Sequence, residues 1–461
     1  MSYQDFVSRK LSTVPPTGIT GRVDLAGSLF PHQAALTQWA LKRGRAAIFA
    51  DTGLGKMRME LAWADAVQKY TNQPVMIHTP LAVAAQIARE AKEVGIVAKV
   101  CREQSDLIQG INITNYDRLH KFDTSIFGAV VLDESGCIKH SDTRTFKTLT
   151  EAYRDTPFKL PASATPAPND WTELGTHAEF LGICTKQEML AEFFTHDGGD
   201  TSVWRLKGHA RDIFWRWVSS WGAMIRRPSD LGFDDGAYNL PALHVHEHQV
   251  SYEMPLNGML FATDAQSLSE RREARRASMA DRVAECAALV NAESDEPWIV
   301  WCDLNAEGDA LTKAIDGAVQ ISGADDTDTK ERRLMDFAEG RTRVLISKPS
   351  ICGWGLNWQH AARMAFVGVT DSYEAYYQAV RRCWRFGQTR DVHVHVFASR
   401  AEGAVVANLT RKERDAGKMA ESLSAETRDA VMAEVTGLKR ETNDYNAGKL
   451  VVVPAFLRSA A

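Results

Sequence analysis

The amino-acid sequence predicts an α/β protein with two tandem domains, each a mostly parallel sheet flanked by helices, and a helical insertion between them. Two stretches of the chain alternate short apolar segments with helical patterns, and that alternation is typical of βαβ units. The stretch between them is rich in tryptophan and has helical periodicity. The length of 461 residues suits about three average domains or two large ones.

Composition narrows the class of protein. Hydrophobic residues make up 44% of the chain and charged residues 25%, which excludes a disulfide-rich miniprotein, a coiled-coil rod and a disordered chain. The net charge of −5, taken alone, argues mildly against a nucleic-acid partner. The seven cysteines are an odd number and form no CxxC pair, which argues against a disulfide framework or a zinc ribbon.

The sequence shows no targeting pattern. No apolar run approaches the ~18 residues that a membrane-spanning helix needs, and the N-terminal MSYQDFVSRK has no apolar signal-peptide core. A reducing cytoplasm is therefore the expected location.

The first domain begins near Leu29, and its pattern predicts four strands. Helical patterns follow the first two of these strands, as expected for crossovers between parallel strands. The strands are predicted at residues 46–50, 75–80, 111–116 and 127–134.

The second domain begins near Pro297 and repeats the alternation, with predicted strands at 298–302, 343–348, 363–369 and 392–397. The predicted division is an N-terminal segment 1–28, a first domain 29–185, a helical insertion and linker 186–296, a second domain 297–400 and a C-terminal helical extension 401–461.

A glycine-rich loop carries the main chemical signal. After the first predicted strand the chain reads Thr52-Gly53-Leu54-Gly55-Lys56 and then becomes helical. Backbone N–H groups of such a loop, with the helix N-terminus, bind phosphate oxygens. The glycines let the backbone approach closely, and the lysine reaches the β- and γ-phosphates. The pattern predicts an ATP site; the alternative is a glycine turn before a helix that starts with lysine.

The next residue departs from the usual pattern. Met57 stands where such loops have a serine or threonine whose hydroxyl binds Mg²⁺. A thioether is a soft ligand and suits Mg²⁺ poorly. We therefore expect the metal to depend on the phosphates, on water and on Asp133, and slower hydrolysis is one expectation.

An acidic pair ends the fourth predicted strand. Asp133 and Glu134 follow the apolar segment VVL, at the edge of a parallel sheet where ligands bind. Asp133 can hold Mg²⁺ through water, and Glu134 can orient and deprotonate an attacking water.

An arginine cluster lies near the end of the second domain. Arg382 and Arg385 are three residues apart, between Gln378 and Gln388, and on a helix they share a face. Two guanidinium groups on one face can bind a γ-phosphate held by another domain. The alternative is a solvated basic helix end.

Together these residues resemble the superfamily 2 helicase-like ATPases, and among them the Swi/Snf-type DNA translocases, over roughly residues 29–400. The resemblance implies two tandem RecA-like domains that hold ATP and Mg²⁺ between them and bind double-stranded DNA independently of its sequence. The compact length is similar to short forms from bacteriophage genomes, so the implied location is the cytoplasm of a bacterium or of a phage-infected host.

The resemblance assigns roles to individual residues. Lys56, Glu134, Arg382 and Arg385 would be catalytic, and Asp133 would bind the metal. The residues that would bind the nucleotide are Gln33 (as the reader of adenine), Thr52, Gly53, Leu54, Gly55, Lys56, Met57, Asp133 and Gly355. The residues that would contact nucleic acid are Thr79, Pro80, Asn115, Tyr116, Ser163, Thr165, Lys348, Trp354 and Asn357.

Two further segments resemble the Swi/Snf branch, residues 169–181 and residues 224–227. Three positions depart from the family. They are Met57, Arg381, where glycine is usual, and Trp384, where histidine is common.

Alternating histidines offer a second possible site. His244, His246 and His248 share one face of a strand, and His393 and His395 repeat the spacing. A metal site is one interpretation, and a polar strand face is the favoured one. The acidic run at 325–328 is interpreted as a solvent loop rather than a calcium loop.

The leading functional hypothesis is an ATP-driven translocase on double-stranded DNA. The alternatives are a helicase that separates strands of forks or RNA, and a weakly hydrolysing, ATP-switched nucleic-acid-binding factor. The charge distribution is compatible with all three. Residues 251–350 have 12 basic and 19 acidic residues, whereas residues 351–400 have 6 and 3, so a positive cleft beside an acidic flank is predicted.

Overall fold

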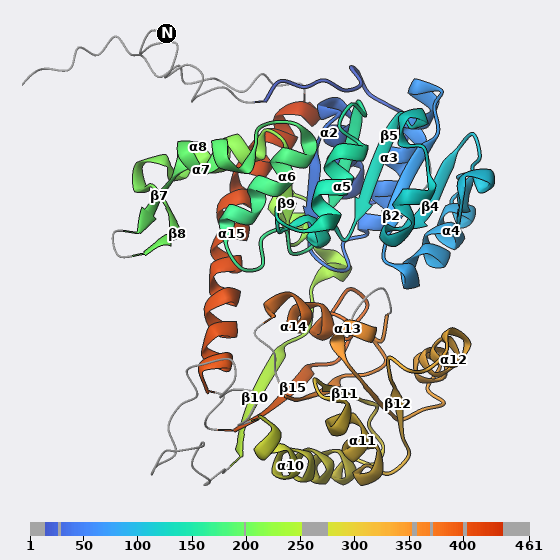
Figure 1. Cartoon of the computed structure of the whole chain (residues 1–461), viewed down its shortest axis with the longest axis vertical. Helices are drawn as coiled ribbons and strands as arrows, with labels where there is room; N and C mark the ends of the chain where they lie inside the picture. Colours follow the sequence, from blue (N-terminus) through green and yellow to red (C-terminus); the bar gives the residue numbers. More distant parts are fainter. Residues whose placement is uncertain are drawn as a thin grey trace, which may run out of the picture.

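The computed structural model describes residues 14–25, 29–197, 200–250, 275–352, 357–368, 372–399 and 403–436. Figure 1 shows two α/β lobes, with one long helix extending beside both. Each lobe contains one sheet in which all paired strands are parallel. The predicted fold class is therefore confirmed.

The first sheet has the strand order β3-β4-β2-β5-β6-β1-β9. Its central strands are buried throughout, as expected for a parallel sheet covered on both faces. One core packs under α2, α3 and α4, and a second under α5 to α8. The strands are β1 Ala47–Ala50, β2 Val75–Thr79, β3 Ala98–Val100, β4 Ile111–Asn115, β5 Ala129–Asp133, β6 Phe158–Ala162 and β9 Gly222–Ile225. The helices are α2 Pro31–Arg43, α3 Lys56–Thr71, α4 Ala84–Glu93, α5 Arg144–Ala152, α6 Leu174–Leu181, α7 Lys186–Phe193 and α8 Arg211–Ser219.

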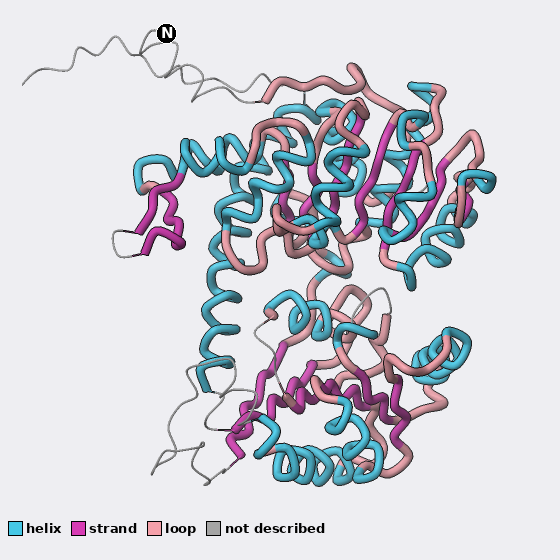
Figure 2. The backbone as a smooth tube through the Cα atoms, in the orientation of Figure 1, coloured by secondary structure: helices cyan, strands magenta, loops and turns pink. Residues whose placement is uncertain are grey.

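The second sheet has the strand order β10-β15-β14-β11-β13-β12. Helices α10 and α11 pack on one face, and α12, α13 and α14 on the other, so strands alternate with covering helices again (Figure 2). The strands are β10 Leu243–Val250, β11 Trp298–Cys302, β12 Ala318–Ile321, β13 Val344–Ser347, β14 Arg363–Val367 and β15 Val392–Ser399. The helices are α10 Met279–Ala292, α11 Asn305–Ala314, α12 Thr327–Ala338, α13 Pro349–Cys352 and α14 Tyr373–Val380.

The segment predicted as an insertion, residues 186–296, contributes to both lobes. It contains α7, α8 and an antiparallel hairpin of β7 Phe194–Asp197 with β8 Asp200–Leu206, which projects from the first lobe in Figure 1. It also supplies β9 to the first sheet and β10 to the second. The strand β9 was not predicted, because a single apolar run of four residues does not distinguish strand from helix. The strand β10 contains the alternating histidines, whose spacing indicated a strand.

Helix α15, Gly403–Thr436, connects the second lobe back to the first. It packs against α8, α2 and β9 of the first lobe and against α14 of the second. The Thr427 hydroxyl accepts a hydrogen bond of 2.9 Å from the Met224 backbone N–H, so the helix covers a donor on the edge strand β9. Neither α15 nor any other helix in the described ranges is long and apolar enough to cross a membrane.

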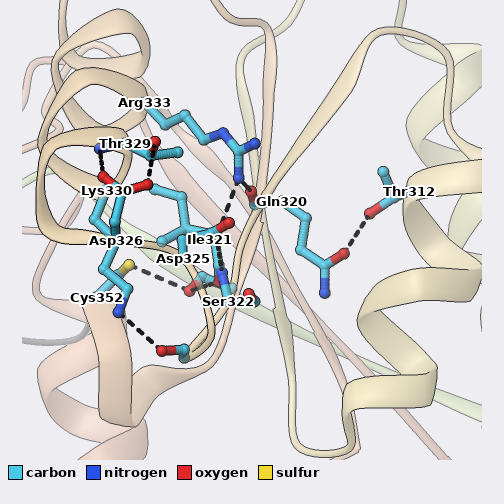
Figure 3. Close-up of polar contacts among 12 residues, drawn as sticks. Thr312, Gln320, Ile321, Ser322, Asp325, Asp326, Thr329, Lys330, Arg333 and Cys352 are labelled. Carbon is cyan, nitrogen blue, oxygen red and sulfur yellow. Dashed lines mark hydrogen bonds and ion pairs between the residues drawn. The ribbon is translucent and has the colours of Figure 1, made fainter.

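The acidic run before α12 caps that helix. The Asp326 carboxylate accepts hydrogen bonds of 2.8 Å from the backbone N–H and the hydroxyl of Thr329. Asp325 accepts one of 2.7 Å from the Ser322 N–H and lies 3.1 Å from the Arg333 guanidinium, as Figure 3 shows. These carboxylates are therefore engaged in local structure.

The five histidines form a ladder across β10 and β15. His246 Nε2 lies 3.0 Å from His393 Nδ1, and His248 Nε2 lies 2.9 Å from His395 Nδ1. Each pair can share one proton as an N–H···N bond. Because no three histidine, cysteine or acidic side chains are grouped to hold a metal anywhere in the described ranges, the ladder is a polar strand face.

A fully buried ion pair holds the second lobe together. Arg282 on α10 and Glu307 on α11 have no exposed side-chain surface and lie 2.8 Å apart. The Glu307 carboxylate also accepts hydrogen bonds of 2.9 Å from the backbone N–H groups of Asp303 and Leu304. The pair thus joins two helices to the end of β11.

Replacing Glu307 with glutamine leaves Arg282 buried beside a neutral group. We expect the free energy of unfolding of the second lobe to fall by about 3–5 kcal/mol, measured by urea unfolding. Glu296→Gln is the control, because its pair with Arg390 is partly exposed and such pairs contribute roughly 0–1 kcal/mol. Equal losses in the two variants would contradict this account.

The histidine ladder predicts an acid-sensitive second lobe. Burial, with the charge of neighbouring histidines, lowers the pKa of His248 and His393, and lowers that of His395 to about 4. Glu285 near His248 and Asp391 near His393 oppose these shifts, and Arg363 adds to those of His393 and His395.

Because the folded pKa values lie below the unfolded value of about 6.5, the unfolded chain binds more protons below that pH. The stabilisation is fully present above pH 6.5 and is lost as the pH falls towards 4. The melting temperature of the second lobe should therefore decrease from pH 7 to pH 5, and less so in a His248→Asn/His395→Asn variant. If the melting temperature of the variant falls as much as that of the wild type, the acid sensitivity belongs to other groups.

Candidate active site

The glycine-rich loop connects β1 to α3, and Gln33 on α2 holds it in place. Gly53 and Gly55 have φ values of 94° and 78°, which favour glycine. A Cβ on Gly55 would lie 2.3 Å from the Gln33 amide nitrogen. That amide donates a 3.0 Å hydrogen bond to the Leu54 carbonyl, and its oxygen accepts one of 3.0 Å from the Phe30 N–H. Gln33 therefore fixes both the loop and the start of α2.

Lys56 and Met57 begin α3 with different environments. The Lys56 ammonium donates a 3.0 Å hydrogen bond to the Ala50 carbonyl, at the start of the loop. The Met57 side chain is half-buried and packs against the apolar core of the first lobe. The position at which related loops have a hydroxyl is thus occupied by a packing group.

The acidic pair lies at the end of β5, beside the loop. Burial, with the charge of Glu134, raises the pKa of Asp133 to about 7. The Thr79 hydroxyl donates a 2.7 Å hydrogen bond to the Asp133 carboxylate, and the Tyr116 hydroxyl donates one of 2.6 Å to its backbone carbonyl. Glu134 has φ 53°, a strained conformation for a non-glycine residue that is common at functional sites.

The other residues predicted to contact nucleic acid lie in varied surroundings. Pro80 is half-buried after β2, and Asn115 ends β4. The Ser163 hydroxyl accepts a 3.1 Å hydrogen bond from the Thr165 N–H, and both residues are buried. Lys348 is half-buried after β13 and Asn357 is exposed, whereas Trp354 and Gly355 lie outside the described residues. Contacts of this set with nucleic acid stay a prediction.

The two predicted arginines follow α14, and both lie within electrostatic range of Glu134 in the first lobe. Burial lowers the pKa of Arg382 to about 9 and that of Arg385 to about 10, and the charge of Glu134 opposes both shifts. Arg382 is nearly fully buried and donates hydrogen bonds of 3.1 Å to the carbonyl and the amide oxygen of Gln378. The structure thus brings Glu134 of the first lobe together with both arginines of the second.

The lobes also meet at a contact that sequence analysis did not predict. Asp51, which precedes the glycine loop, lies 2.5 Å from the Arg381 guanidinium and also accepts a hydrogen bond from the Tyr377 hydroxyl. The two side chains of the ion pair are 12% and 9% exposed. The Arg381 guanidinium lies 4.4 Å from the Trp384 ring centroid and 5.2 Å from that of Tyr377. Arg381 and Trp384, two of the departures from the family pattern, therefore form one inter-lobe contact.

Two further contacts place the second lobe on the loop region. Lys139, after β5, forms an ion pair with Glu374 of α14. A Cβ on Gly53 would lie 3.0 Å from the Phe386 nitrogen, so the turn after Arg385 touches the loop itself. Only the residue types around Arg382 signalled this surface in the sequence, since the partners lie in the other lobe.

The acidic side chains also suit a hydrated divalent cation bound to phosphate. On α3, Glu60 is buried, and neither of its carboxylate oxygens has a hydrogen-bond partner among the described residues. Mg²⁺ at phosphate sites uses one or two carboxylates with phosphates and water, so it does not need the three-residue cluster that is absent from the described ranges. Asp133 and Glu60 are the carboxylates that fit. Sequence analysis overlooked Glu60, although its spacing of four from Lys56 was a usable signal.

The Asp51–Arg381 contact predicts measurable coupling between the lobes. In a double-mutant cycle of Asp51→Asn and Arg381→Met, we expect a coupling energy of about 0.5–3 kcal/mol in the free energy of unfolding, measured without nucleotide. The exposed pair Arg411–Asp415 on α15 is the control, with about 0.3–0.5 kcal/mol expected. Strictly additive effects at Asp51 and Arg381 would contradict the contact.

Comparisons with known proteins bear on the second lobe above all. Residues 281–387 match the helicase conserved C-terminal domain, and no curated protein matches the chain. Among solved structures, the chain is similar to the Sulfolobus solfataricus SWI2/SNF2 ATPase core in complex with dsDNA, with 16% identity, 91% of this chain and 97% of that chain covered, and a TM-score of 0.42. For the second lobe, the family match confirms the predicted resemblance: residues 281–387 carry a helicase conserved C-terminal domain.

Proposed function

We propose that this protein is a Swi/Snf-type, nucleic-acid-stimulated ATPase that translocates along double-stranded DNA without reading its sequence. The observation that carries the proposal is the position of Arg382 and Arg385. These two arginines of the second lobe lie within electrostatic range of Glu134 of the first, and the residue after Arg385, Phe386, touches the glycine loop at Gly53.

The first lobe would bind the nucleotide. The N–H groups of Gly53 to Lys56 and the N-terminus of α3 would hold the phosphates, and Lys56 would exchange its bond to the Ala50 carbonyl for the β- and γ-phosphates. Gln33 would read adenine beside the rings of His32 and Tyr238, which lie 5.1 Å apart. Bound Mg²⁺ would neutralise charge on the phosphates, held from the protein side by Asp133.

Glu134 would orient and deprotonate the attacking water, while Arg382 and Arg385 would stabilise charge on the γ-phosphate. The arginines can act only when the lobes are closed, because they belong to the second lobe. Hydrolysis would release them, and repeated opening and closing would move the lobes along the DNA backbone.

The bond between Thr79 and Asp133 suggests how DNA would stimulate hydrolysis. Thr79 ends β2, Pro80 follows it, and both are proposed to contact the DNA backbone. Since the Thr79 hydroxyl donates to the Asp133 carboxylate, a shift of this strand end on DNA would reposition the metal-binding carboxylate.

Met57 favours one other function. Its thioether packs into the core and supplies no hydroxyl to a metal, which is compatible with an ATP-switched binding factor that hydrolyses slowly. Strand separation on forks or RNA is the remaining alternative, and the substrate comparison below distinguishes it.

The test is the ATPase rate at low salt with duplex DNA, single-stranded DNA and RNA side by side. We expect duplex DNA of any sequence to stimulate turnover most, with a steep loss at higher salt. Glu134→Gln should lower turnover by about 10²–10⁴-fold, whereas Glu151→Gln, at an exposed pair on α5, should not. Turnover that no nucleic acid stimulates would contradict the translocase, and stimulation by RNA or forked DNA alone would favour the helicase.

A further inference from the structure

Glu60 is a buried carboxylate with no hydrogen-bonding partner. Its residue is 1% exposed, and neither Oε1 nor Oε2 accepts a hydrogen bond within the described residues. An uncompensated buried carboxylate costs several kcal/mol of folding free energy. A cation bound beside Glu60 would offset that cost and favour the ionised carboxylate.

The position of Glu60 on α3 directs it towards the glycine loop. It follows Lys56 by four residues and Met57 by three, so all three lie on one face of the helix. Helical side chains tilt towards the helix N-terminus, which here is the phosphate-binding end. The Glu60 side chain, which is longer than that of serine or threonine, can thus reach the region where a hydroxyl at position 57 would have supplied an oxygen.

A second carboxylate shares this region. α3 packs against β5, whose last residue is Asp133. Burial raises the pKa of Glu60 and so do the charges of Asp133 and Glu134, whereas Lys56 opposes the shift. Glu60 and Asp133 therefore interact electrostatically, and a cation between or beside them would favour the ionised form of both.

We propose that Glu60 and Asp133 together supply the protein's oxygen ligands, directly or through water, to the Mg²⁺ of the bound nucleotide. Glu60 takes over the role of the hydroxyl that Met57 replaces. This inference rests on the proposed function, since the phosphates complete the coordination. It also accounts for how a loop without serine or threonine can retain its metal.

The experiment measures how Mg²⁺ changes the affinity for nucleotide, without requiring turnover. The Kd of a fluorescent ATP analogue is measured in Mg²⁺ and in EDTA for the full chain. In the wild type, Mg²⁺ should tighten binding. The Mg²⁺ gain is the ratio of the Kd in EDTA to the Kd in Mg²⁺. In Glu60→Gln this ratio should be about 10–100-fold smaller than in the wild type, while the Kd in EDTA stays close to that of the wild type.

Rescue and control variants separate a ligand from a packing group. Met57→Thr/Glu60→Gln should recover the Mg²⁺ gain, because it restores the hydroxyl. Glu90→Gln is the matched control, since that carboxylate also lies near Glu60 but accepts a hydrogen bond from Gln86 and pairs with Arg58. Its Mg²⁺ gain should equal that of the wild type.

Thermal unfolding in EDTA checks the fold of each variant. Glu60→Gln should melt at or above the wild-type temperature, because it removes a buried charge. An unchanged Mg²⁺ gain in Glu60→Gln, or no recovery in the double variant, would overturn the role of Glu60 and leave the ATPase proposal intact. A wild type that binds no nucleotide in either buffer would overturn both.

Discussion

The site depends on one contact between the lobes: the turn that follows α14 and contains Arg382 and Arg385 packs against the glycine loop at Gly53. The loop lies at the end of β1 in one lobe, and the arginines lie in the other. Neither lobe alone contains a phosphate loop, an acidic pair and an arginine pair. The ion pair of Asp51 with Arg381 holds these groups together next to Arg382, so the geometry of the site is a property of the closed arrangement.

The charged side chains that meet around the turn after α14 are divided by sign, with carboxylates in the first lobe and arginines in the second. The first lobe contributes Asp51 and Glu134 to the charges between the lobes, and the second contributes Arg381, Arg382 and Arg385. Burial lowers the pKa of Arg382 and of Arg385, and the charge of a neighbouring arginine adds to each shift, whereas Glu134 opposes both. A triphosphate with its metal would add negative charge where Arg382 and Arg385 lie and positive charge where the carboxylates lie. A bound nucleotide with its metal would therefore complement the charges of both lobes.

Local sequence encodes the parts of the site but not their partners. The glycine loop, Asp133 with Glu134 and the spacing of Arg382 from Arg385 could be predicted, because strand ends and helix faces follow from neighbouring residues. The partner of Arg381 lies 330 residues away, and no local pattern links Thr79 to Asp133. The strand β9 was missed for the same reason: a short apolar run is assigned to a sheet only by what lies beside it. The alternation of His244, His246 and His248 did indicate the strand β10, but not the sheet that it joins.

Chain connectivity limits how far the lobes can separate. The polypeptide passes from β9 in the first lobe to β10 in the second, and α15 then returns to the first lobe. A cavity of about 210 Å³ between the lobes is lined by Asp51, Arg381 and Glu413 of α15, among others, so the returning helix borders the inter-lobe contact. Helix α15 contacts both α14 of the second lobe and the edge strand β9 of the first. In the proposed cycle, separating the turn after α14 from the first lobe would therefore bend or shift this helix.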